Sequence, residues 1–156
     1  MLAKKIAVIG IGNTLRRDDG IGIVVLEFLL KFYKRQRIDY FNFGSASLDL
    51  INQIRNYARV LLIDGINAGL AAGEVKIFTL TDIDYNLDIA FTSTHSFNLK
   101  NIFDLAKKSG VKTKIYVAGI QIEDASYGEG LSNVLRNKKK DIIKKIRVFI
   151  DSLCSF

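Results

Sequence analysis

The 156-residue sequence contains one cysteine, one histidine and no proline or tryptophan. Because Cys154 is alone, an intrachain disulfide and a cysteine cluster around a metal are both excluded, and this usage is typical of a reducing compartment. No apolar run is long enough to span a bilayer, and the short run near the amino terminus is followed by Arg-Arg-Asp-Asp rather than a cleavage site. We therefore expect a soluble, cytoplasmic protein with no membrane partner.

The formal net charge is +7, and the excess lysines and arginines gather in a few short stretches. These stretches lack interleaved aromatic residues and any recognisable binding module, so we interpret them as solvated helix ends and faces. We expect no nucleic-acid partner. The length suits a single domain over residues 1–156, with a core that needs no disulfides.

Short apolar runs alternate with helical patterns along the chain. Strands are predicted at residues 5–11, 38–43, 59–63, 75–80 and 113–118. Helices are predicted at residues 20–33, after a cap at Ser45 or Ser47, from about 92 to 110, and from about 131 onward. Residues 81–91 are predicted to form a surface loop. Leu48 and Leu105 are predicted to lie on buried helix faces.

This alternation predicts an α/β fold, a three-layer α/β/α sandwich with a mostly parallel, twisted sheet of about five strands. The run at residues 75–80 is predicted to be an antiparallel edge strand. In such sheets, functional groups gather at the carboxyl ends of the strands. The loops at residues 12–20, 44–47, 64–67 and 119–130, together with the helix start at Thr94-His95, are therefore expected at one edge.

Residues 10–22 read GIGNTLRRDDGIG and follow the first strand. Gly10 and Gly12 supply two glycines of a dinucleotide fingerprint, but Leu15 stands where the third belongs. Asp18 and Asp19 disfavour a phosphate at the amino end of the following helix. One of the two aspartates is expected to cap that helix, which leaves the other free to point into the crevice.

Asp64 follows a buried apolar run and is expected to project at the carboxyl edge of the sheet, where His95 also arrives. Asp19, Asp64 and His95 together form a ligand set suited to a divalent cation with open positions, such as nickel, iron or zinc. Paired aspartates with Asp64 also describe a phosphoacceptor receiver domain that binds magnesium. That pattern requires a lysine just after the last strand, where this chain has Gln121.

Nucleophilic catalysis has little support, because no serine stands in a Gly-x-Ser-x-Gly elbow and Cys154 lies near the chain end. Hydrolysis by this chain would use a water activated by a metal or a carboxylate.

The GxGNxLxxDDGxG signature of residues 10–22, followed by Asp64 at a strand end and His95 before a helix, resembles the hydrogenase maturation endopeptidases. The resemblance covers nearly the whole chain. It implies a hydrolase, an aspartyl-type endopeptidase that removes the C-terminal extension of a nickel-iron hydrogenase large-subunit precursor after nickel insertion. The precursor is then the partner, and the substrate delivers the nickel; no organic cofactor is expected.

Carried over by this resemblance, Asp19, Asp64 and His95 are both the nickel-contacting and the catalytic residues. The residues expected to position the substrate or orient the turn are Gly12, Asn13, Asp18, Gly44 and Ser45. Two alternatives without protease activity stay open: a receiver-like module that binds a divalent metal, and a dinucleotide-binding module.

Overall fold

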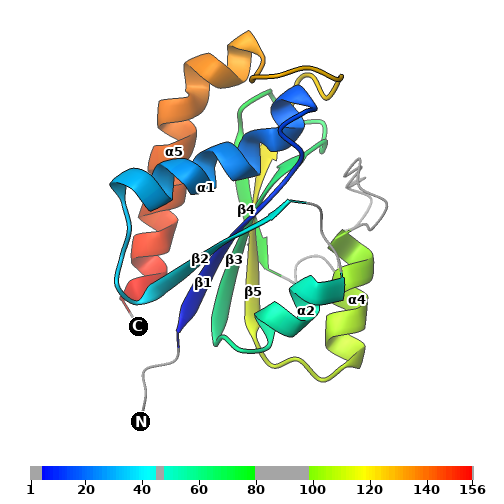
Figure 1. Cartoon of the computed structure of the whole chain (residues 1–156), viewed down its shortest axis with the longest axis vertical. Helices are drawn as coiled ribbons and strands as arrows, with labels where there is room; N and C mark the ends of the chain where they lie inside the picture. Colours follow the sequence, from blue (N-terminus) through cyan, green and yellow to red (C-terminus); the bar gives the residue numbers. More distant parts are fainter. Residues whose placement is uncertain (1–4, 45–47, 80–98, 156) are drawn as a thin grey trace.

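The computed structural model describes residues 5–44, 48–79 and 99–155, and within them a single five-stranded sheet has the order β2-β1-β3-β5-β4 (Figure 1). The strands are β1 (Ile6–Ile11), β2 (Ile38–Gly44), β3 (Arg59–Ile66), β4 (Val75–Thr79) and β5 (Lys114–Gln121). The pairs β1–β2, β1–β3 and β3–β5 are parallel, whereas β4 pairs with β5 antiparallel. The predicted mixed sheet with an antiparallel edge strand is confirmed.

Helices cover both faces of the sheet. One face carries α1 (Ile21–Phe32) and α5 (Asn133–Cys154), and the other carries α2 (Leu48–Ile54) and α4 (Leu99–Lys108) (Figure 1). A single 3-10 turn, η1 (Arg17–Gly20), leads into α1. The three-layer α/β/α architecture is therefore confirmed.

The central strands are apolar on both sides because each side packs against a helix layer. Val8 and Leu61 belong to the core beneath α1 and α5, whereas their neighbours Ala7 and Leu62 belong to the core beneath α2 and α4. Successive side chains of a strand point to opposite faces, so a nearly continuous apolar run fills two cores at once.

Two strands run further than predicted. Residues 64–66 of β3 pair in parallel register with residues 119–121 of β5, so Asp64 lies inside β3 rather than at its end. The predicted strand ended at residue 63 because Asp64-Gly65 is typical of a turn. A Cβ on Gly65 would lie 2.8 Å from Cγ2 of Ile122, so this glycine serves close packing.

The predicted burial of two leucines is wrong. Leu48 begins α2 and is 52% exposed, and Leu105 is 40% exposed. The buried stripe of α4 instead follows the i, i+3, i+4, i+7 spacing of a helix face. Its members are Leu99, Ile102, Phe103 and Ala106.

Several predictions lie outside the described residues: the cap at Ser45 or Ser47, the loop at residues 81–91, and the helix start with His95. In the parts of the chain that are described, none of the helices combines the length and apolarity that crossing a membrane requires.

Candidate active site

The glycines of the GIGNTLRRDDGIG stretch bring the start of α1 against the sheet. A Cβ on Gly22 would overlap the carbonyl oxygens of Ile11 in β1 and Ile63 in β3, and a Cβ on Gly10 would lie 2.9 Å from the Gly22 carbonyl oxygen. Only glycine allows backbones to come so close. The η1 turn is thereby held at the carboxyl ends of β1 and β3, next to Asp64.

The turn after β1 is shaped around Asp19. Gly12, with φ +151°, donates its amide to the Gly44 carbonyl at 2.8 Å, and any Cβ on Gly12 would overlap the Asp19 carbonyl oxygen. The Asn13 amide donates to the Asp19 carboxylate at 3.2 Å. Gly12, Asn13 and Gly44 therefore determine where Asp19 lies. Their contact with substrate stays a prediction, and Ser45 lies outside the residues that the structure describes.

Asp18 is completely buried, and its carboxylate holds the β5–α5 loop (residues 122–132) against η1. The carboxylate accepts hydrogen bonds from the amides of Glu123 and Asp124, both at 3.0 Å, and from the amide and hydroxyl of Ser132 at 2.7 and 2.8 Å. Hydrogen bonds to an ionised carboxylate are stronger than neutral ones. Asp18 thus joins the η1 turn to a loop more than 100 residues away, and its part in positioning the substrate stays a prediction.

The predicted aspartate cap of the first helix is wrong. The residue at the N-cap of α1 is Gly20, and no side chain accepts a hydrogen bond there. The turn preceding α1 directs the Asp18 carboxylate away from the helix amides and toward the loop before α5. The Ser132 hydroxyl, which donates to Asp18, also accepts the Leu135 amide and so caps α5.

Asp64 is 1% exposed, and neither of its carboxylate oxygens has a hydrogen-bond partner among the described residues. Asp19 is 2% exposed and lies close enough for its charge to act on Asp64. Burial, and then the charge of Asp19, raise the pKa of Asp64 well above its usual range, although the nearby Gly65 amide opposes this slightly. The β1–α1 turn and β3 therefore bring two buried acids together.

Burying a carboxylate that accepts no hydrogen bond costs free energy unless a cation neutralises its charge. Asp19 and Asp64 are the two predicted ligands that the structure brings together. The described residues contain no group of three His, Cys, Asp or Glu side chains placed for a metal ion, and the third predicted ligand, His95, lies outside them. Carboxylate oxygens suit a divalent cation, and the donor set present fits such an ion.

Sequence reasoning gave Gln121 no role of its own. This residue is 5% exposed, and its side-chain oxygen accepts the amides of Ala68 at 2.8 Å and Leu70 at 3.2 Å. Its side-chain amide donates to Asn67 at 3.2 Å. Gln121 thus fixes the loop that leaves β3 just beyond Asp64. The available signal was an amide side chain at the end of an apolar strand.

Comparison with known proteins identifies the family of this chain. A family model described as hydrogenase maturation protease matches residues 23–148, more than half of the chain. The chain belongs to the hydrogenase maturation protease family. This protease is 27% identical to the hydrogenase expression/formation protein HoxM of Cupriavidus necator over 143 residues, which cover 90% of this chain and 71% of HoxM.

Solved structures share the fold. The [NiFe] hydrogenase maturation protease HycI of Thermococcus kodakarensis is 26% identical to this protease, with a TM-score of 0.73 over 92% of this chain and 90% of HycI. The hydrogenase maturating endopeptidase HybD of E. coli is 20% identical, with a TM-score of 0.80 over 95% of this chain and 93% of HybD. By its family, the protein is a protease, a hydrolase of hydrogenase maturation.

Family membership replaces the two alternative interpretations. The glycines that suggested a dinucleotide site pack α1 against the sheet. The two aspartates that suggested a receiver domain have separate positions, because Asp18 holds the β5–α5 loop and Asp19 lies beside Asp64.

Proposed function

We propose that this protease removes the C-terminal extension of a nickel-iron hydrogenase large-subunit precursor in the cytoplasm, after nickel has been inserted, and that it recognises the nickel held by that precursor. The observation that carries the proposal is the Asp64 carboxylate, buried beside Asp19 with both oxygens unpaired among the described residues. Such a pair favours a divalent cation over any neutral or anionic group.

The nickel arrives with the substrate. Cysteines of the precursor hold most of its coordination sphere, and Asp19, Asp64 and His95 contribute the remaining contacts. Carboxylate and imidazole groups are both suitable ligands for nickel. A precursor without nickel brings no cation to the two acids, so its tail gains less from docking in the crevice. The same electrostatics therefore supports binding and a check of metal loading.

Hydrolysis follows once the scissile peptide lies beside the metal. A water molecule attacks the carbonyl carbon, one of the two carboxylates takes the water proton, and the C–N bond breaks as that proton passes to the leaving amine. The raised pKa of Asp64 suits a group that must hold a proton during this transfer.

The test incubates the protease with its cognate nickel-loaded precursor and measures the mass of the precursor C-terminus. Asp19→Asn, Asp64→Asn and His95→Ala should each slow the shortening by about 100-fold or more, because each removes a nickel contact or a proton acceptor. Asp49→Asn is the matched control, since Asp49 is an exposed carboxylate on α2. No shortening by the unmodified protease, or equal shortening by Asp19→Asn, would overturn the proposal.

A further inference from the structure

Two loops that are distant in sequence form one rigid wall beside the acid pair. The Arg17 amide donates to the Gly128 carbonyl at 3.0 Å, and the Gly128 amide donates to the Leu15 carbonyl at 2.9 Å. The Asp18 amide donates to the Asp124 carbonyl at 3.0 Å, in addition to the contacts of the Asp18 carboxylate. The tip of the β5–α5 loop is therefore fixed to the β1–α1 turn by main-chain hydrogen bonds.

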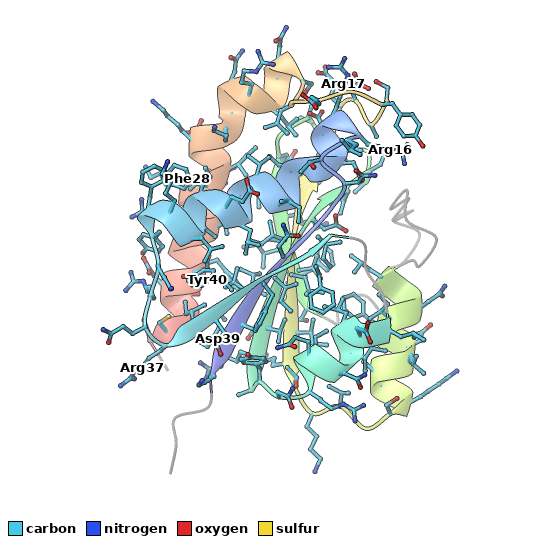
Figure 2. The ribbon with its side chains drawn as sticks, viewed as in Figure 1. Arg16, Arg17, Phe28, Arg37, Asp39 and Tyr40 are labelled. Atoms are coloured by element: carbon cyan, nitrogen blue, oxygen red, sulfur yellow. The ribbon has the colours of Figure 1, made fainter. Side chains whose placement is uncertain are left out.

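This wall directs three side chains outward: Leu15, Arg16 and Tyr127, which we call the loop platform. Leu15 is 61% exposed and Tyr127 is 82% exposed. The Arg16 guanidinium lies 5.4 Å from the centre of the Tyr127 ring, and its Nε donates to the Ala125 carbonyl at 3.1 Å. Figure 2 shows Arg16 at the end of the molecule where α1 begins, opposite the end that carries Arg37.

The two arginines of the turn differ in their partners. Arg17 forms an ion pair with Asp124, with 3.5 Å between Arg17 Nε and the carboxylate. Arg16 forms no ion pair with any residue that the structure describes. Its charge is held in place by the Tyr127 ring and the Ala125 carbonyl, neither of which neutralises it. Arg16 is therefore the cation on this wall that suits an acidic group of a partner.

The platform adjoins the acid pair. The Asp19 amide donates to the Arg16 carbonyl at 3.0 Å, so Arg16 and Asp19 lie at the two ends of one tight turn. Exposed tyrosine and leucine side chains and a half-buried arginine on a fixed backbone lose little conformational freedom on binding, and tyrosine and arginine are enriched among residues that dominate binding energy. A polypeptide that reaches Asp19 therefore has Arg16 within the same turn of the chain.

We propose that the loop platform docks the segment of the hydrogenase precursor that flanks the scissile bond. An apolar side chain of that segment packs on Leu15 and Tyr127, and an acidic group beside it pairs with Arg16. This inference rests on the proposed function, because it concerns the same substrate. It adds a surface that positions the substrate, and it predicts that the docked segment of the precursor carries a negative charge.

The test measures kcat and KM for cleavage of the cognate nickel-loaded precursor. Arg16→Gln should raise KM about tenfold with little change in kcat, because it removes a binding contact and no reacting group. Arg16→Lys, which keeps the charge, should stay within about threefold of the unmodified KM. The matched control is Arg37→Gln, at the opposite end of the molecule.

The apolar half of the platform has its own pair of variants. Tyr127→Ala should raise KM about tenfold, whereas Phe32→Ala, which removes an aromatic ring that is 63% exposed on α1, should leave KM unchanged. The KM of the unmodified protease should also rise with salt, and that of Arg16→Gln should rise less.

The outcomes separate the two proposals. If the unmodified protease does not shorten the precursor, the proposed function fails and the platform inference fails with it. If the unmodified protease shortens the precursor, but Arg16→Gln and Tyr127→Ala keep its KM, the platform inference alone is overturned. Equal increases in KM for Arg16→Gln and Arg16→Lys would also overturn it, since they would show a structural role and no charge contact.

Discussion

The Asp18 carboxylate accepts four hydrogen bonds from the β5–α5 loop, whereas the adjacent Asp19 carboxylate accepts the Asn13 amide and faces Asp64. The two residues differ in role because the tight turn directs their side chains apart. Asp18 joins two loops of the site, and Asp19 belongs to the acid pair. At the residue scale, one carboxylate maintains structure, and the other belongs to the proposed active site.

Asp18→Ala should destabilise the protein by about 3 kcal/mol, because three main-chain amides and a hydroxyl lose the buried carboxylate that accepts their hydrogen bonds. Urea unfolding measures this change, and hydrogen exchange should show faster exchange at Glu123 and Asp124. Asp49→Asn, an exposed change of charge, should stay close to the unmodified stability. Unfolding of Asp18→Ala at the same urea concentration as the unmodified protein would contradict the structural role of the Asp18 carboxylate.

Asp64→Asn should stabilise the metal-free protein near neutral pH while abolishing cleavage. In the unfolded chain Asp64 ionises near pH 4, whereas in the folded chain burial and Asp19 raise its pKa. The contribution of Asp64 to stability is therefore fully present below its unfolded pKa and is lost as pH rises through its folded pKa.

Asparagine does not titrate, so the Asp64→Asn variant does not lose stability as the pH rises. The Tm of Asp64→Asn should exceed that of the unmodified protein by about 5 °C near pH 7, and the difference should vanish near pH 4. Thermal unfolding across this pH range is the measurement. A Tm difference that is independent of pH would contradict the account of the buried acid pair.

At the element scale, the contact of α1 with β1 and β3 places the acid pair. Gly22 allows this contact, because a Cβ there would overlap two carbonyl oxygens of the sheet. Gly22→Ala should cost about 3 kcal/mol or more and should lower kcat, since α1 and η1 must shift away from Asp64. Gly110→Ala is the matched control: Gly110 has φ +69° and open space around it, so the cost should be about 1 kcal/mol. Equal losses in urea unfolding would contradict the packing argument.

Element types followed from the sequence because apolar periodicity reports which faces are buried. The runs at residues 6–11 and 60–63 are apolar throughout, and both prove to lie in interior strands of the sheet. Boundaries were less predictable. Gly65 resembled a turn residue but allows close packing inside β3, and Leu48 matched the helical spacing but begins its helix outside the core.

At the scale of the whole molecule, the topology made the acid pair predictable and the loop wall unpredictable. Parallel strands bring their carboxyl ends to one edge, so Asp19 and Asp64 could be assigned to one crevice from element order alone. The bonds of Asp18 to Glu123 and Ser132 join residues 105 and 114 positions apart. Such pairing depends on loop conformation, which apolar periodicity does not encode.

The most direct test of the central claim compares nickel-loaded and nickel-free forms of the same precursor. Both are incubated with the unmodified protease, and the mass of the precursor C-terminus is followed with time. We expect shortening of the nickel-loaded form and an intact nickel-free form, because we propose that the nickel of the precursor contacts the buried pair of Asp19 and Asp64. Equal shortening of the two forms would contradict it.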